Sequence, residues 1–325
     1  MPALDTRGGR LGPHLAVMPE EVAEVLSVRR GGRYVDATVG EGGHAERMLV
    51  DSAPDGELLA VDWDEQALER SRQRLERFGA RVRFARSSFG ELRDLLTDAG
   101  WPEGADGVLV DLGVSTLQLS LDERGFSFAA DGPLDMRMDR RSSRTAADLV
   151  RELAESELAD LLYRFGEEPA SRRIARAIVT ERRLVPIETT ARLRAIVSRA
   201  GAHARPGRDP ATRTFQALRI AVNGELVELE RLLDEGWNLV RAGGRLAVLS
   251  YHSLEDRMVK QAFKRWAAPC ICPPGLPICG CGWKARVRPV ARRRLRPAAA
   301  EIAGNPRARS AGLRAVERIA DEVGS

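Results

Sequence analysis

Short apolar runs and amphipathic stretches alternate along the first third of the chain. Four of the apolar runs predict β-strands, at Tyr34–Thr38, Glu57–Asp62, Arg81–Ala85 and Gly107–Leu112. Around them, apolar residues recur at helical spacing, which predicts helices at His14–Val28, His44–Asp51, Glu65–Phe78 and Phe89–Ala99. Strands that alternate with helices in this way predict a parallel sheet with right-handed crossovers.

The alternation stops between residues 116 and 212. Helical patterns replace it, at Ala146–Leu153, Ser156–Tyr163, Glu168–Arg183 and Thr189–Ala200. It resumes with a long helix, a fifth strand and another helix, at Thr214–Leu239, Arg245–Tyr251 and Glu255–Ala267. We therefore predict an α/β protein whose doubly wound, Rossmann-like sheet is formed by residues 1–115 and 213–325, with an all-helical insertion over 116–212 that faces the substrate.

Composition and charge fit a globular protein that contacts nucleic acid. The chain is 43% hydrophobic and 30% charged, with a formal net charge of +4 and a pI of about 9.1. The segment from Lys284 to Arg318 carries eleven Lys or Arg residues against two Glu. Such an imbalance favours contact with phosphates.

The N-terminal stretch has no apolar signal-peptide core, and no apolar run approaches the roughly 18 residues of a membrane span. We expect a flexible lead over residues 1–13 and a cytoplasmic protein with no membrane partner.

A glycine turn links the first predicted strand to the next helix. Gly40, Gly42 and Gly43 lie where the backbone must turn sharply and approach a ligand closely. The glycines alone are equally compatible with a cofactor site and with a turn that serves packing only.

Acidic residues around this turn favour one cofactor over another. Asp62 ends the second strand, where doubly wound folds bind ribose hydroxyls, and Asp64 is the better candidate for a helix cap. Asp36, Glu41 and Glu46 would repel the pyrophosphate of a nicotinamide dinucleotide. They suit S-adenosylmethionine, which carries a sulfonium and an ammonium instead, so we favour S-adenosylmethionine as the cofactor.

Two further strand ends carry candidate catalytic residues. Strand four closes with Asp111, and Ser115 follows in the sequence DLGVS. The carboxyl ends of parallel strands open onto one crevice, so Asp111 is placed to hold the group that receives a methyl. His252 follows strand five and is a second candidate for the same pocket, with a purely structural role as the alternative.

Several long motifs resemble one bacterial family throughout the chain. They include RGFSFAADGPLDMRMD (124–139), TRTFQALRIAVNGEL (212–226) and HSLEDRMVK (252–260), together with DATVGEGGH (36–44) and DLGVSTLQL (111–119). The sequence resembles the S-adenosylmethionine-dependent ribosomal RNA small-subunit methyltransferases H, the MraW family, which methylate N4 of a cytosine in 16S rRNA. The resemblance implies a class I methyltransferase sheet and a substrate in the decoding region of an assembled small ribosomal subunit.

The resemblance also implies which residues contact the cofactor. These are Gly42, Gly43, His44, Asp62, Phe89, Asp111 and Gln118. For catalysis we assign Asp111 to orient the amine, with Ser115 or its neighbouring backbone assisting and His252 as the second candidate. No metal is assigned to the reaction, and no DNA partner is expected.

The target base must leave its helix to reach such a pocket. Phe126 and Phe128 are candidates for stacking on it, although aromatic residues in such loops usually form small cores. A further set of residues, together with the basic segment, is predicted to bind RNA phosphates: Arg137, Arg140, Arg141 and Arg144. Solvated charged faces are the alternative for each arginine.

All four cysteines lie close together, in the pattern CxC-x6-CxC formed by Cys270, Cys272, Cys279 and Cys281. Four thiolates on a tight hairpin suit zinc, but CxC is less usual than CxxC, and a reduced Pro/Gly loop is the alternative. By the resemblance, only part of the family carries this segment, so the reaction does not need it.

Three other functions remain open on the sequence. The nearest is a DNA amino-methyltransferase. A non-catalytic RNA-binding or ribosome assembly protein with a vestigial fold is the second, and the intact glycines, Asp62 and Asp111 argue against it. A nicotinamide oxidoreductase is the third, and the acidic glycine turn disfavours it.

Overall fold

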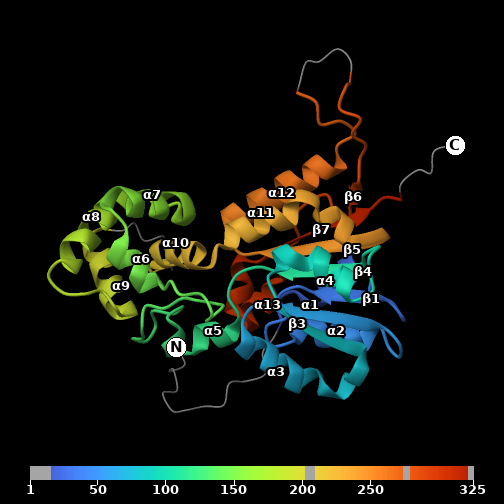
Figure 1. The fold of residues 1–325 in the computed structure, drawn as a ribbon, viewed down its shortest axis with the longest axis horizontal. Helices are drawn as coiled ribbons and strands as arrows, with labels where there is room; N and C mark the ends of the chain where they lie inside the picture. Colours follow the sequence, from blue (N-terminus) through green and yellow to red (C-terminus); the bar gives the residue numbers. More distant parts are fainter. Residues whose placement is uncertain (1–15, 202–208, 274–278, 321–325) are drawn as a thin grey trace.

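The computed structural model describes residues 16–201, 209–273 and 279–320, so the predicted flexible lead over 1–13 lies outside the described residues. A seven-stranded sheet with the order β3-β2-β1-β4-β5-β7-β6 forms the centre of one half of the molecule (Figure 1). The first five strands are parallel and comprise β1 (Arg33–Asp36), β2 (Glu57–Asp62), β3 (Val82–Arg86), β4 (Ala105–Asp111) and β5 (Val240–Ser250). The predicted α/β, doubly wound fold is confirmed.

Helices cover both faces of the sheet because its central strands are apolar on both sides. One face packs on α1 (Pro19–Leu26), α2 (Gly43–Asp51) and α3 (Glu65–Leu75). The other packs on α4 (Leu92–Asp98), α11 (Glu225–Glu235) and α12 (Ser253–Ala267). In β4, Leu109 faces the first group, whereas Val108 and Val110 face the second, as the two-residue period of a strand requires.

The strand order reverses between β1 and β4, so the chain runs outward from this point in both directions. Asp36 pairs with Leu109, and Asp111 with Leu249, at the carboxyl ends of their strands. Ligands bind at such switch points in open α/β sheets because the loops on either side diverge there. The glycine turn and α2 begin at this position.

The helical unit lies beside the carboxyl edge of the sheet (Figure 1). Its helices are α5 (Thr116–Ser120), α6 (Ala146–Glu152), α7 (Glu155–Gly166), α8 (Ser171–Arg182), α9 (Thr190–Arg199) and α10 (Thr212–Asn223). Residues from Phe126 to Leu218 form its own hydrophobic core. The predicted domain boundaries at 115/116 and 212/213 stay a prediction. Beyond the second of them, α10 contributes Phe215 and Leu218 to the core of the helical unit.

The single long helix predicted over Thr214–Leu239 is wrong. Gly224, with φ of 62°, ends α10 and begins α11 in the left-handed region, which glycine adopts without strain. The side chain of Asn223 turns back at this break, accepting from Met138 N (2.7 Å) and donating to Met136 O (2.8 Å). These hydrogen bonds fasten the end of α10 to the loop that contains Met136 and Met138, within the helical unit.

The basic segment after residue 284 is part of the sheet and was not predicted to be so. It contains β6 (Val287–Pro289), α13 (Ala299–Gly304) and β7 (Gly312–Arg318), and β7 pairs antiparallel with β5. Several of its arginines are bound within the fold: Arg314 donates to Asp256 at 2.9 Å, and Arg318 donates to Val240 O at 2.9 Å.

Candidate active site

The glycine turn after β1 has the backbone that its sequence predicts. Gly40 and Gly42 have φ of 52° and 81°, in the left-handed region that a side chain would strain. Gly42 is the N-cap of α2, and a Cβ built on it would lie 3.4 Å from Ser71 Cβ. The turn therefore places backbone without side chains, together with the N-terminus of α2, at the switch point.

Asp62 fastens this turn to the end of β2. Its Oδ2 accepts a hydrogen bond from Gly40 N and its Oδ1 accepts from Asp64 N, both at 2.9 Å. Burial raises the pKa of the Asp62 carboxyl to about 6. Asp64 caps α3 by accepting from Gln66 N at 3.1 Å, which confirms its predicted capping role.

Asp111 lies at the end of β4 between two aromatic rings. The Tyr251 hydroxyl donates to its Oδ1 at 2.8 Å, and His44 Nε2 lies 3.8 Å from its Oδ2. Its backbone N–H donates to Thr38 Oγ1 at 2.7 Å. Burial, reinforced by the charge of Glu255 and opposed by the Tyr251 hydrogen bond, raises the pKa of the Asp111 carboxyl to about 7.

A third carboxyl, Asp36, lies behind these two at 1% exposure. Burial, reinforced by the charges of Asp111 and Asp62, raises its pKa to about 8. Within the described ranges, none of the three carboxyls has an Arg or Lys within ion-pair distance. A cluster of this kind stabilises a cationic ligand, which suits the sulfonium and ammonium of S-adenosylmethionine.

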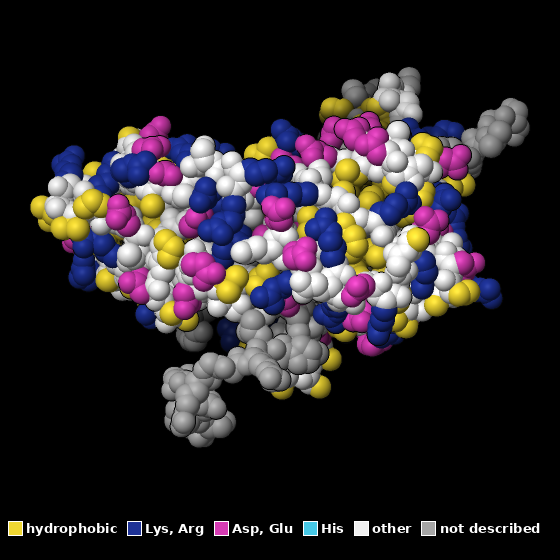
Figure 2. Space-filling model, turned by 60° about the horizontal axis from the view of Figure 1, so that its bottom comes forward, with side chains coloured by type: hydrophobic (Ala, Val, Ile, Leu, Met, Phe, Trp, Pro, Cys, Tyr) yellow, Lys and Arg dark blue, Asp and Glu magenta, His cyan; other side chains and the backbone are white. Residues whose placement is uncertain are grey.

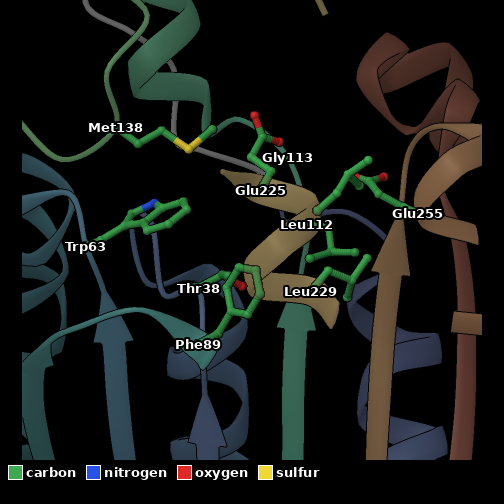
Figure 3. A pocket seen from close by; sticks show the side chains of 10 residues that line it. Thr38, Trp63, Phe89, Leu112, Gly113, Met138, Glu225, Leu229 and Glu255 are labelled. Carbon is green, nitrogen blue, oxygen red and sulfur yellow. The ribbon is translucent and has the colours of Figure 1, made fainter. Parts of the chain in front are cut away.

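A pocket lined mainly by apolar side chains lies next to the acidic edge. Figure 3 shows Trp63 and Phe89 on one side of it and Leu112 and Leu229 on the other, with Met138 above Trp63. The rings of Trp63 and Phe89 lie 5.9 Å apart, centroid to centroid. The site therefore combines a flat apolar wall with carboxyls, which fits an adenosyl group with a cationic tail.

Two predicted site residues, Ser115 and Gln118, form the capping box of α5. Ser115 Oγ accepts from Gln118 N at 3.2 Å, and Gln118 Oε1 accepts from Ser115 N at 3.0 Å. Gln118 Nε2 donates onward to Asp64 Oδ2 at 2.9 Å, where the buried Arg124 also donates at 2.7 Å. The start of α5 lies against the glycine turn, since a Cβ built on Gly40 would be 3.9 Å from Ser115 Cβ.

His252 is the N-cap of α12 and belongs to a second capping box. Its Nδ1 accepts from Glu255 N at 3.4 Å, and its Nε2 lies 3.0 Å from Glu255 Oε1. Although burial acts to raise it, the charges of His252 and Arg219 hold the pKa of Glu255 below its ordinary value. Glu255 lines the pocket, so His252 lies behind it and Tyr251 lies nearer to Asp111.

Sequence reasoning missed Tyr251 and Trp63. Each lies beside a predicted site residue, Tyr251 before His252 and Trp63 after Asp62, but strand-end position alone does not show which neighbour points into the crevice. It also missed the pair of Arg219 and Glu225, joined by two hydrogen bonds of 2.8 Å, through which Glu225 is fixed at the pocket.

The predicted stacking residues lie in the core of the helical unit. Phe126 is 7% exposed, and the ring of Phe128 packs edge-on against Phe215 at 4.8 Å. The small-core alternative therefore accounts for both rings.

The predicted RNA-binding arginines are partly engaged within the protein. Arg137 and Arg141 pair with the aspartates two residues before them, at 2.8 and 2.7 Å, and Arg144 with Glu152 at 3.4 Å. Figure 2 shows Lys and Arg interspersed with Asp and Glu on the face in view, over the helical unit and the sheet alike.

Within the described residues, every helix is too short or too polar to cross a bilayer.

The fold and site define an S-adenosylmethionine-dependent methyltransferase with a Rossmann-like sheet. The chain belongs to the MraW methylase family, whose model matches residues 12–319. It is 51% identical to the ribosomal RNA small subunit methyltransferase H of Symbiobacterium thermophilum over 308 residues, which cover 94% of this chain and 96% of that protein. The protein of the same name from Syntrophobacter fumaroxidans is 50% identical over 94% of this chain and 96% of its own length.

Solved structures similar to this one include a putative rRNA methylase from Clostridium thermocellum, with 13% identity and a TM-score of 0.41 over 95% of this chain and 100% of that chain. A second is an rRNA methylase from Streptococcus thermophilus, with 14% identity and a TM-score of 0.37 over 93% and 94% of the two chains. The predicted family and cofactor are confirmed by the family match, and the individual site residues stay predictions.

Proposed function

We propose that this protein transfers a methyl group from S-adenosylmethionine to N4 of a cytosine in the decoding region of 16S rRNA, within the small ribosomal subunit and in the cytoplasm. The names of the relatives support a small-subunit rRNA substrate. One observation supports the rest of the proposal: a partly buried carboxyl, Asp111, ends β4 at the switch point, beside the apolar pocket and hydrogen-bonded to Tyr251. A carboxylate there suits an amine as methyl acceptor.

The acidic edge and the glycine turn are the parts of the chain that would hold the cofactor. We assign its contacts to Gly42, Gly43, His44, Asp62, Phe89, Asp111 and Gln118. When bound, S-adenosylmethionine supplies an electrophilic methyl carbon on a sulfonium. Phe89 and Trp63 offer an apolar wall for a purine, and Asp62 keeps acceptor capacity for hydroxyl groups beyond its two backbone hydrogen bonds.

The chain's contribution to the reaction is to orient the amine. The lone pair of cytosine N4 is delocalised into the ring, so the amine is a poor nucleophile until it is turned and held in line. A carboxylate oxygen of Asp111 accepts a hydrogen bond from an N–H of the amine. This bond directs the lone pair of the nitrogen into the crevice, and the carboxylate offsets the positive charge that develops on the nitrogen. With a pKa of about 7, the Asp111 carboxyl is also suited to take the proton that the methylated amine releases.

Ser115 and His252 assist from their capping positions. The Ser115 hydroxyl accepts from Gln118 N and keeps its own proton to donate towards the base. His252, through Glu255, fixes the pocket wall behind Tyr251. We therefore propose Asp111 as the catalytic residue, Ser115 as an auxiliary donor and His252 as a positioning residue.

Transfer of labelled methyl groups tests this function. We expect labelling of small ribosomal subunits from cells that lack this activity, and none of duplex DNA, since a paired base cannot enter the pocket. Labelling of DNA alone would indicate a DNA amino-methyltransferase. Cofactor binding without labelling of any RNA or subunit would indicate a non-catalytic ribosome assembly protein.

A further inference from the structure

A hairpin between α12 and β6 gathers all four cysteines of the chain. It projects from the end of α12, away from the helical unit (Figure 1). The Sγ atom of Cys270 lies 3.4 Å from the Sγ of Cys279 and 3.7 Å from that of Cys281. The Sγ atom of Cys279 also lies 3.9 Å from the Sγ of Cys272 and 3.5 Å from that of Cys281. All four sulfur atoms lie within 4.8 Å of one another.

These distances are those of a tetrahedral sulfur cage. Zinc binds thiolates at about 2.3 Å, and the corners of a tetrahedron of that radius are about 3.8 Å apart. Four of the six sulfur–sulfur separations, at 3.4–3.9 Å, enclose this value, and all six lie within 4.8 Å. Each CxC pair supplies two corners from one arm of the hairpin, so the cage needs both arms.

Disulfides account less well for the same arrangement. A disulfide joins two sulfur atoms at about 2.0 Å and does not require a second cysteine pair to lie close by. Here the Sγ of Cys279 lies close to the Sγ atoms of all three other cysteines. The backbone N–H of Cys272 also donates to Cys270 Sγ at 3.3 Å. Hydrogen bonds of this kind stabilise a metal-bound thiolate from outside the coordination shell.

Beyond its base, the described part of the hairpin has no apolar core. Its base is fastened where Trp283 Nε1 donates to Ala268 O at 3.0 Å and Arg286 N donates to Trp266 O at 2.8 Å. Between these points, none of the described residues is buried. A segment without an apolar core needs a cross-link or a metal to hold one conformation.

We propose that Cys270, Cys272, Cys279 and Cys281 bind one structural zinc ion that orders this hairpin. A closed shell of four thiolates leaves no position for water or substrate, so the ion holds structure and takes no part in methyl transfer. The 15 residues of α12 separate the hairpin from His252 at the site, about 22 Å at 1.5 Å per residue. The inference is therefore independent of the proposed function.

Metal analysis of the full chain, purified under reducing conditions from zinc-supplemented medium, tests the proposal. We expect one zinc per chain, released by a mercurial reagent together with four titratable thiols. Cobalt substitution should give the absorption of a tetrahedral tetrathiolate site. Protein without zinc, or with iron in its place, would overturn the proposal.

Two variants separate metal binding from folding. The Cys272→Ser/Cys279→Ser variant should lose zinc and expose residues 268–286 to limited proteolysis, with S-adenosylmethionine affinity unchanged. Ile271→Ser is the matched control, because Ile271 lies between two ligands, is 45% exposed and offers no ligand atom to zinc. It should keep the ion; zinc loss from the control, or full retention by the double variant, would contradict the assignment.

Discussion

Buried or partly buried carboxyls occur in two regions beside the same crevice, and the two regions differ in the partners of these carboxyls. Behind the crevice, Asp64 is paired with Arg124 at 2.7 Å, both side chains being 2% exposed, and Glu225 is paired with Arg219 at 2.8 Å. At the sheet edge, the hydrogen-bond and ion-pair partners of Asp36, Asp62 and Asp111 among the described residues are backbone N–H groups, the Tyr251 hydroxyl and the His44 imidazole, and burial raises the pKa values of the three carboxyls.

The difference distinguishes carboxyls that stabilise the fold around the site from carboxyls that bind a ligand. A buried carboxylate with an arginine partner is satisfied within the fold, whereas an uncompensated cluster costs stability and persists where a ligand supplies the missing charge. On this account, changes in the first region destabilise folding, and changes at the sheet edge alter binding and turnover.

The largest expected effect is on folding, in the paired region. Arg124→Met leaves Asp64 buried without its cation, so we expect a loss of about 3–5 kcal/mol in the free energy of unfolding. Chemical denaturation measures it. Arg141→Met is the control, since Arg141 is 61% exposed beside Asp139, and should cost at most about 0.5 kcal/mol. Equal losses for the two variants would erase the distinction between the regions.

The next effect is on turnover, at the sheet edge. Asp111→Ala should lower kcat about 10²–10³-fold, because the amine loses its acceptor, while cofactor affinity falls less. Single-turnover methylation and a binding titration separate the two quantities. Unchanged turnover would refute the role of Asp111.

A control for this variant lies on the same strand. Asp106 is at the opposite end of β4, where it pairs with Arg29 and Arg241. Asp106→Ala should affect stability and leave turnover per folded molecule unchanged.

Cofactor affinity should depend on pH. The carboxyls of Asp62 and Asp111, with pKa values of about 6 and 7, are ionised above those values and become neutral as the pH falls through them. Attraction for a cationic ligand is then lost, and we expect about tenfold weaker binding of S-adenosylmethionine at pH 5 than at pH 7.5. Calorimetric titration of the wild type and of Asp62→Asn, which should flatten the profile, measures this. Tighter binding at low pH would contradict it.

The smallest effect concerns RNA affinity. Arg292 and Arg293 are exposed on the basic segment, and replacing both by alanine should reduce the slope of log affinity against log salt by about 1.4. Arg151→Ala is the comparison, because Arg151 is exposed but already paired with Asp148 and Glu152, so its slope should match that of the wild type. Filter binding over a salt series tests both variants.

The sequence was sufficient for the parallel sheet and its acidic edge. Strands such as β2 are continuous apolar runs, and the residue that ends a parallel strand falls on the crevice whatever the exact register. Asp62 and Asp111, predicted to end the second and fourth strands, are the last residues of β2 and β4.

Other parts depended on contacts distant in the chain. The segment from Lys284 to Arg318, which contains β7, was interpreted as an RNA-binding segment because it carries eleven Lys or Arg residues, whereas Arg314 and Arg318 are bound within the fold. The contact of Tyr251 with Asp111 joins residues 140 positions apart. The capping box of Ser115 and Gln118 was readable, since Ser-x-x-Gln at a helix start is its signature.

The central claim is that the acidic sheet edge directs methyl transfer to an exocyclic amine of 16S rRNA. Mass mapping of rRNA nucleotides tests it most directly, in cells with the wild-type protein, with the Asp111→Ala variant and with neither. The account predicts one N4-methylated cytosine in 16S rRNA that requires the wild-type protein. A methyl group on a ring carbon, or the same N4 methylation with Asp111→Ala, would contradict it.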